Sequence, residues 1–85
     1  MKRATQLIMA EHSLLCNQSY LDLLRYDVNA NEYVTCINTH TELASERLYR
    51  KFELKQIPLM EFNEAKSIII RIHSAYLKKG NINYG

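Results

Sequence analysis

Apolar and polar residues alternate with the period of an α-helix in three long segments of the chain. In the first, residues 5–24, apolar side chains recur at spacings of three and four on one broad face, and Glu11 and Gln18 lie on the opposite side. Ile8 and Leu15 fall outside the apolar face. The pattern predicts a helix that buries this face, which consists of Leu7, Met9, Ala10, Leu14, Cys16, Tyr20, Leu21, Leu23 and Leu24.

A second helix is predicted over residues 30–54. Asn29 followed by Glu32 reads as a capping box, in which the two side chains satisfy backbone N–H groups at the start of the helix. A strand over residues 32–37 is the chief alternative, because EYVTCI is rich in β-formers. The helical pattern continues to residue 54 and favours a helix throughout. Its apolar face consists of Val34, Cys36, Ile37, Leu43, Ala44, Leu48 and Phe52.

Pro58 separates the second helix from a third, predicted over residues 59–79. Proline disfavours helical geometry in the residue before it and suits the first turn of a helix that follows. Gly80 is placed to end this helix, and residues 81–85 are predicted to be a loosely ordered tail. The apolar positions with helical spacing are Phe62, Ala65, Ile69, Ile72 and Tyr76.

Together the three segments predict an all-α fold, a three-helix antiparallel bundle that forms a single domain over residues 1–85. Two glycines and one proline provide too few breaks for many short strands. Each apolar face spans about half of its helix, which is wider than the ~100° that one core requires. We therefore expect a homodimer that completes the bundle. The residues predicted at its interface are Phe62, Ile69, Ile72, Tyr76, Tyr20 and Tyr33.

Composition narrows the setting in which the protein works. Two cysteines are too few for a disulfide framework, and the first ten residues lack the pattern of a signal peptide, so a reducing cytoplasm is expected. The longest apolar run, Ile68 to Ile70, is far shorter than the roughly 18 residues of a membrane span. We expect a soluble protein without a membrane partner.

Two mirrored stretches, HSLLC and CINTH, place a histidine and a cysteine four residues apart on each of the first two helices. If these helices form a hairpin centred on Tyr26, His12, Cys16, Cys36 and His40 converge on a Cys₂His₂ zinc site. A disulfide between the cysteines is a second hypothesis. The third interpretation, that all four belong to a shared core face, needs neither and is preferred.

A basic cluster interleaved with aromatic residues lies near the end of the second helix. Cations that contact phosphates and an aromatic ring that stacks on bases are the ingredients of a nucleic-acid interface. The net charge of +2 is lower than expected when phosphate contacts dominate binding. The residues of this alternative site are Arg47, Tyr49, Arg50, Lys51 and Lys55.

The chain contains no motif that predicts catalysis. It has no glycine before residue 80 and therefore no glycine-rich phosphate loop, and it has neither a nucleophile-elbow nor a His-Glu-x-x-His motif. The sequence predicts a non-enzymatic helical protein–protein interaction module that acts as a regulator, adaptor or inhibitor and needs no cofactor. The alternatives are a nucleic-acid-binding regulator and a hairpin stabilised by zinc.

Overall fold

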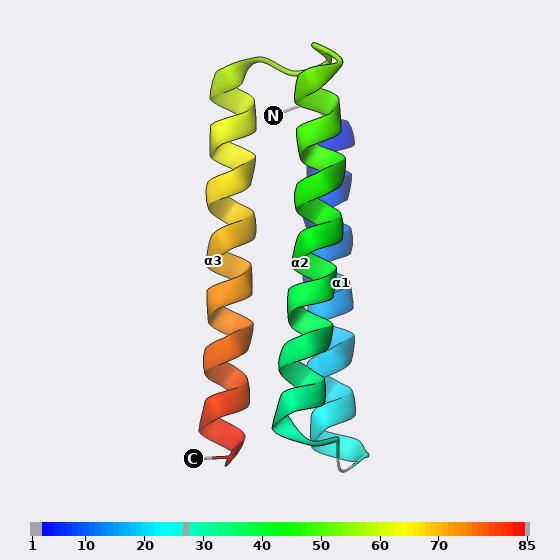
Figure 1. The fold of residues 1–85 in the computed structure, drawn as a ribbon, viewed down its shortest axis with the longest axis vertical. Coiled ribbons are helices and arrows are strands. Elements are labelled where there is room, and N and C mark those ends of the chain that lie inside the picture. Colours follow the sequence, from blue (N-terminus) through cyan, green and yellow to red (C-terminus); the bar gives the residue numbers. More distant parts are fainter. Residues whose placement is uncertain (1–2, 27, 85) are drawn as a thin grey trace.

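Three long helices lie side by side along the whole molecule, and each runs antiparallel to the one before it (Figure 1). A computed structural model describes residues 3–26 and 28–84, the last four by their backbone alone. The helices are α1 (Arg3–Arg25), α2 (Ala30–Glu53) and α3 (Leu59–Tyr84), and all three pack against one another in a rod of 42 × 17 × 17 Å. The predicted all-α three-helix bundle is confirmed. Residues 32–37 lie within α2, so the strand alternative is wrong.

The turn between α1 and α2 ends at the predicted helix cap. The Asn29 side chain accepts a hydrogen bond of 2.9 Å from the backbone N–H of Glu32. The Glu32 carboxylate returns to Asn29, but it accepts from the side-chain amide at 3.0 Å rather than from the backbone. The cap places the start of α2 at Ala30, as the sequence predicts.

The C-terminus of α2 closes in a Schellman motif centred on Lys55. The N–H of Gln56 donates to the carbonyl of Lys51 at 2.9 Å, and the N–H of Lys55 donates to that of Phe52 at 3.0 Å. Lys55 has a φ of 59°, in the left-handed region where glycine is the usual residue. The chain then turns through Ile57, which is buried, and enters α3 after Pro58.

The Lys55→Gly substitution is expected to raise the free energy of unfolding by about 0.5–1 kcal/mol, because glycine adopts the left-handed conformation without a Cβ penalty. Urea unfolding followed by circular dichroism measures the change. The control is Lys51→Gly, which lies inside α2 and should lower stability by about 1 kcal/mol. Destabilisation by both substitutions would contradict a strained Lys55.

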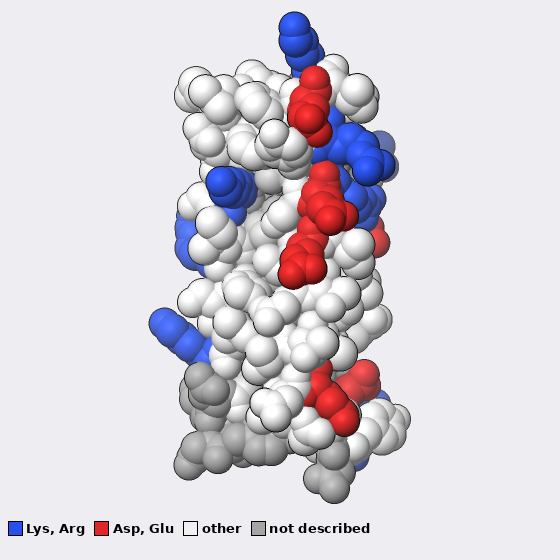
Figure 2. Space-filling model, viewed as in Figure 1, with Lys and Arg blue, Asp and Glu red and all other residues white. Residues whose placement is uncertain are grey.

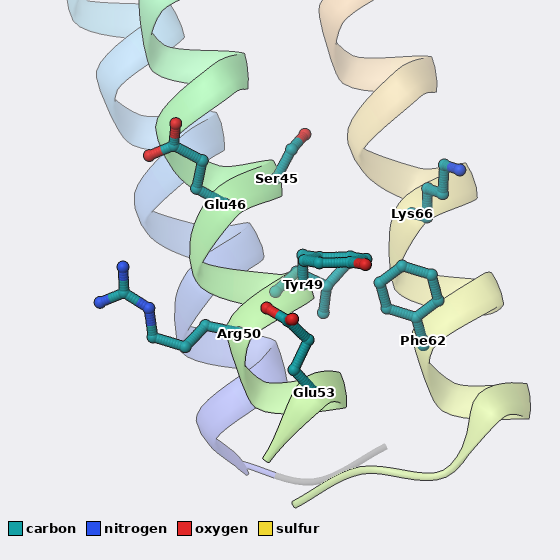
Figure 3. A pocket seen from close by; sticks show the side chains of 8 residues that line it. Ser45, Glu46, Tyr49, Arg50, Glu53, Phe62 and Lys66 are labelled. Carbon is teal, nitrogen blue, oxygen red and sulfur yellow. The ribbon is translucent and has the colours of Figure 1, made fainter. Parts of the chain in front are cut away.

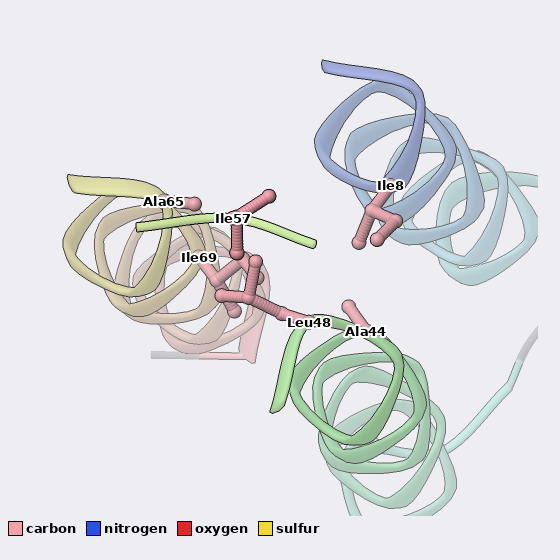
Figure 4. Packing of buried hydrophobic residues seen from close by; sticks show 6 residues of the cluster. All are labelled: Ile8, Ala44, Leu48, Ile57, Ala65 and Ile69. Atoms are coloured by element: carbon pink, nitrogen blue, oxygen red, sulfur yellow. The ribbon is translucent and has the colours of Figure 1, made fainter. Parts of the chain in front are cut away.

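The core consists of two clusters of buried side chains stacked along the rod. The first lies toward the Pro58 end and takes side chains from all three helices and the second turn: Ile8, Ala44, Leu48, Ile57, Ala65 and Ile69 (Figure 4). The second, toward the other end, consists of Cys16, Leu23, Tyr33 and Ile37. Each cluster joins residues far apart in sequence, so the helices depend on one another for burial.

The residues predicted to form a dimer interface lie in this intramolecular core. Ile69 and Tyr33 are almost completely buried within one copy. Phe62 packs on the first cluster, and Tyr20, Ile72 and Tyr76 pack on the second. Tyr33 and Ile69 are therefore not accessible to a second copy, whereas a role at an interface for the other four, which are partly exposed, stays a prediction.

Helix α1 faces the core with only part of the predicted face: Cys16 and Leu23 are buried and Met9 and Tyr20 pack against the core, as predicted. Its buried residues are Thr5, Ile8, His12, Cys16 and Leu23. Leu7, Leu14, Leu21 and Leu24 are instead 57%, 56%, 41% and 54% exposed. The core accepts two polar residues because each has a partner on another helix, Glu61 for Thr5 and Thr41 for His12.

Helix α3 continues through Gly80 to Tyr84, so the predictions that it ends at residue 79 and that Gly80 stops it are wrong. Residues up to Tyr84 of the predicted loose tail are helical, and Gly85 lies outside the described residues. Gly80 is buried against the ring of Tyr33, where an added Cβ would lie 2.6 Å from Cε2. Glycine is present here for space rather than to end the helix.

Within residues 3–26 and 28–84, none of the helices combines the length and the apolar character that crossing a bilayer requires.

Candidate functional site

The His12 ring is buried, and only one of its two nitrogens has a hydrogen-bond partner. Its Nε2 lies 2.9 Å from the Thr41 hydroxyl oxygen. That hydroxyl donates its own hydrogen to the Ile37 carbonyl at 2.8 Å, so it accepts from His12. The ring is therefore the neutral tautomer protonated at Nε2. Nδ1 is buried without a hydrogen-bond partner.

The other members of the mirrored motif point in different directions. His40 Nε2 lies 3.0 Å from the Ser19 hydroxyl, Cys16 is buried and Cys36 is exposed. Both cysteines are free, so the predicted disulfide is absent. The part of the chain that the structure describes contains no group of three or more side chains able to hold a metal ion. The predicted zinc convergence of His12, Cys16, Cys36 and His40 is absent as well.

The rotation of α2 explains why these residues do not meet. Helix α2 turns Tyr33, Ile37, Ala44 and Leu48 toward the core, and Cys36 lies off this side and is exposed. The predicted shared core face therefore holds for His12 and Cys16, which are buried, and is wrong for Cys36. Burial also raises the pKa of the Cys16 thiol to about 11, so it stays protonated and is a poor nucleophile or ligand.

Three of the five residues of the predicted basic cluster, Arg47, Arg50 and Lys51, line one hollow of about 290 Å³ near the end of α2. Arg47 pairs with Glu11 at 2.7 Å across the α1–α2 boundary, Tyr49 faces α3, and Lys55 lies in the turn. Figure 2 shows carboxylates interrupting the basic side chains on the face in view. Lys51 is half-buried and Arg50 lies beside acidic neighbours. The structure therefore brings Arg47, Arg50 and Lys51 together, whereas Tyr49 and Lys55 lie apart from them.

A shallow pocket of about 550 Å³ lies between α2 and α3 (Figure 3). The rings of Tyr49 and Phe62 meet edge to face across it, with centroids 6.1 Å apart. Its rim carries charges of both signs and therefore does not select for phosphate. The pocket suits an apolar side chain better than a nucleotide. Its lining consists of Ser45, Glu46, Leu48, Tyr49, Arg50, Glu53, Phe62 and Lys66.

A row of exposed leucines runs along α1 outside the core. Leu7, Leu14, Leu21 and Leu24, hereafter the α1 leucine row, lie on the side of α1 opposite its buried residues. The outward faces of the other helices are mainly polar, with Thr35, Thr39, Glu42 and Glu46 exposed on α2 and Ser67, Arg71, Ser74 and Lys78 exposed on α3. Apolar residues exposed on these two helices include Leu43, Tyr49, Met60 and Ile70. Helix α1 is thus apolar on two opposite sides.

The helical pattern predicted these leucines on the buried face of the first helix, so this surface was not predicted. The signal that identifies it is the seven-residue spacing of Leu7, Leu14 and Leu21, with Leu24 three residues beyond. Thr5, Ile8 and His12 repeat at spacings of three and four on the other side. Two interleaved patterns on one helix appear as a single wide apolar face when only hydrophobicity is counted.

The fold and this surface define a small all-α bundle with an outward-facing apolar helix. No family model, curated protein or solved structure matches the chain. The function is therefore inferred from the chemistry of the surface.

Proposed function

We propose that the protein is a small, non-enzymatic helical interaction module, acting as a regulator, adaptor or inhibitor, that binds a partner protein through the α1 leucine row. The supporting observation is the exposure of the four leucines, 41–57%, on the side of α1 away from the core. Contiguous apolar surface of this kind marks interaction sites, and a helix that is apolar on both sides is suited to burial on both.

The energetics favour a reversible complex. Burying a leucine completely is worth about 1.5–3 kcal/mol, and these leucines are about half exposed, so each contributes about 1 kcal/mol when covered. Association costs at least ~4 kcal/mol in lost freedom of motion. The free energy gained by burying the four leucines is therefore close to the free energy that association costs. The side chains that flank the row set the net affinity. Such a balance suits a regulator that binds and releases.

The basic cluster supports nucleic-acid binding less well than the row supports protein binding. Arg47 is engaged by Glu11, and the pocket that includes Arg50 also includes Glu46 and Glu53. Phosphate binding gains affinity from unneutralised positive charge, which this arrangement reduces. The α2–α3 pocket could take an apolar side chain of a partner, as a secondary contact.

A photo-cross-linking amino acid at position 14 tests the proposal in living cells. Leu14 lies in the row and is 56% exposed, and Ile70 on α3 is exposed to the same 56%, which makes position 70 a matched control. We expect protein adducts from position 14, none above background from position 70, and loss of the adducts when Leu21→Glu is added. Equal adduct formation at the two positions would contradict an interaction surface on α1.

A further inference from the structure

We propose that the partner of the α1 leucine row is the α1 helix of a second copy of the chain, and that the two helices run antiparallel. This inference rests on the interaction role proposed above for the row, and it adds the identity and orientation of the partner. The supporting observations are the spacing of the row, the order of charges along one of its edges and the mainly polar outward faces of α2 and α3.

The row has the spacing of a two-stranded coiled-coil seam. Leu7, Leu14 and Leu21 recur every seven residues, and Ala10 and Leu24 each follow one of them by three. Positions with this repeat drift only about 20° per heptad around a straight helix, and all five are exposed. A seam of this kind is buried by a helix with the same pattern. A second copy of the chain supplies that helix.

The charges along one edge of the row are ordered so that opposite charges meet when two copies of the helix lie antiparallel. Glu11, Gln18 and Arg25 follow one another at seven-residue spacing, each one residue after a seam position, and all are exposed. Antiparallel helices bring this edge of both copies together, so Gln18 lies at the twofold axis and Glu11 faces the partner's Arg25. A parallel pair would set this edge against the uncharged one formed by Gln6, Ser13 and Tyr20.

The ion pair within one copy is compatible with this contact. Arg47 donates to Oε2 of Glu11 at 2.7 Å, and a carboxylate accepts hydrogen bonds at both oxygens. Both side chains are about half exposed, so Glu11 lies within reach of a neighbouring molecule. In the antiparallel dimer Glu11 therefore lies between two arginines, one from each copy.

A twofold axis at Gln18 also sets which seam residues meet. Leu14 packs against the partner's Leu24, and Leu21 lies beside the partner's Asn17. The Asn17 side-chain oxygen accepts a hydrogen bond of 3.3 Å from the Tyr76 hydroxyl, so its carbonyl already has a partner in its own copy. A polar residue at one seam position lowers stability and favours one register over others.

The size of the contact predicts a dimer that dissociates on dilution. In this register residues 13–25 of the two α1 helices overlap over about 20 Å, so a strip about 10 Å wide covers roughly 200 Å² of each copy. Stable interfaces bury about 800 Å² per partner, so this helix pair is well below that size. We expect a dissociation constant on the order of 100 μM.

Light scattering of the full chain from about 5 to about 500 μM tests the inference. The average mass should rise from the chain mass of 10.0 kDa toward twice that value. The Leu14→Glu, Leu21→Glu double variant should stay monomeric throughout, with an unchanged circular dichroism spectrum because both positions are exposed. Ile70→Glu, exposed to the same 56% as Leu14, should dimerise like the unmodified chain.

Charge reversal tests the orientation. In an Arg47→Gln background, which removes the partner of Glu11 within one copy, Glu11→Arg and Arg25→Glu should each weaken dimerisation about tenfold, and the double variant that exchanges the two charges should restore it. Residues 11 and 25 lie 14 positions, or about 21 Å, apart on one helix, so restoration requires contact between copies.

A chain that remains monomeric at the highest concentration would overturn the second copy as the partner, and so would a dimer that survives Leu14→Glu with Leu21→Glu. Failure to restore dimerisation by the charge exchange would overturn the antiparallel arrangement. The cross-linking experiment at position 14 then separates the two proposals. Adducts with a different protein would leave the interaction role standing, whereas a monomer without adducts would end both.

Discussion

Replacing Gly80 with valine is expected to lower the free energy of unfolding by about 3 kcal/mol. The first added atom, Cβ, would lie 2.6 and 2.8 Å from two carbons of the Tyr33 ring. The ring cannot move aside cheaply, because it is almost completely buried and its hydroxyl donates a hydrogen bond of 2.6 Å to the carbonyl of Tyr76. Urea unfolding measures the loss. In most helices the same substitution would be mildly stabilising.

A double-mutant cycle with Tyr33 identifies the cause of the Gly80→Val effect. Tyr33→Leu is itself destabilising, since it removes a buried ring from the second core cluster. It also removes the ring carbons that the valine side chain would contact. The double variant should therefore lose less stability than the sum of the two single losses, by at least about 1 kcal/mol. Strict additivity would mean that the contact between α2 and α3 does not limit the side chain at position 80.

The existence and order of the three helices could be predicted from local signals. The capping box at Asn29 and the break at Pro58 mark boundaries that agree with the structure to within two residues. These signals act through neighbouring residues in the chain, so they can be read without knowing the tertiary contacts. The one boundary that failed, at Gly80, depends on Tyr33, which lies on another helix.

The rotation of α1 could not be predicted in this way. Thr5 and His12 are buried because Glu61 and Thr41, far along the chain, supply hydrogen bonds to them. Periodicity placed Leu7, Leu14, Leu21 and Leu24 on the buried face and left Thr5 off it, so the predicted face is rotated from the observed one. The candidate site was missed for the same reason, because the leucines that form it were assigned to the core.

The zinc hypothesis failed through the rotation of α2 rather than through spacing. The spacing of His12 with Cys16 and of Cys36 with His40 does place each pair near one face of its helix. Whether two such pairs meet also depends on which side of each helix faces the other. Helix α2 buries the side that carries Tyr33 and Ile37, and Cys36 is left exposed.

Acidification below pH 6.5 is expected to destabilise the bundle through His12. Burial lowers the pKa of this imidazole from its usual 6.5, and His40 and His73 lower it further. As the pH falls through 6.5, the unfolded chain binds a proton at His12 that the folded chain does not. The His12 contribution to the free energy of unfolding is therefore fully present above pH 6.5. It decreases as the pH falls toward the folded-state pKa, with a limiting slope of about 1.4 kcal/mol per pH unit.

The His12→Gln variant isolates this contribution. Glutamine has no titrating group, and its side-chain amide can donate to Thr41 in place of Nε2. Unfolding free energies of this variant, measured from pH 7.5 to about pH 5, should decrease less steeply than those of the unmodified chain. His73→Gln is the comparison, since His73 is the smallest of the three causes that lower the His12 pKa, and this variant should retain most of the acid dependence. If His12→Gln showed the same acid dependence as the unmodified chain, the bare Nδ1 of His12 would not be the group that resists protonation in the folded state.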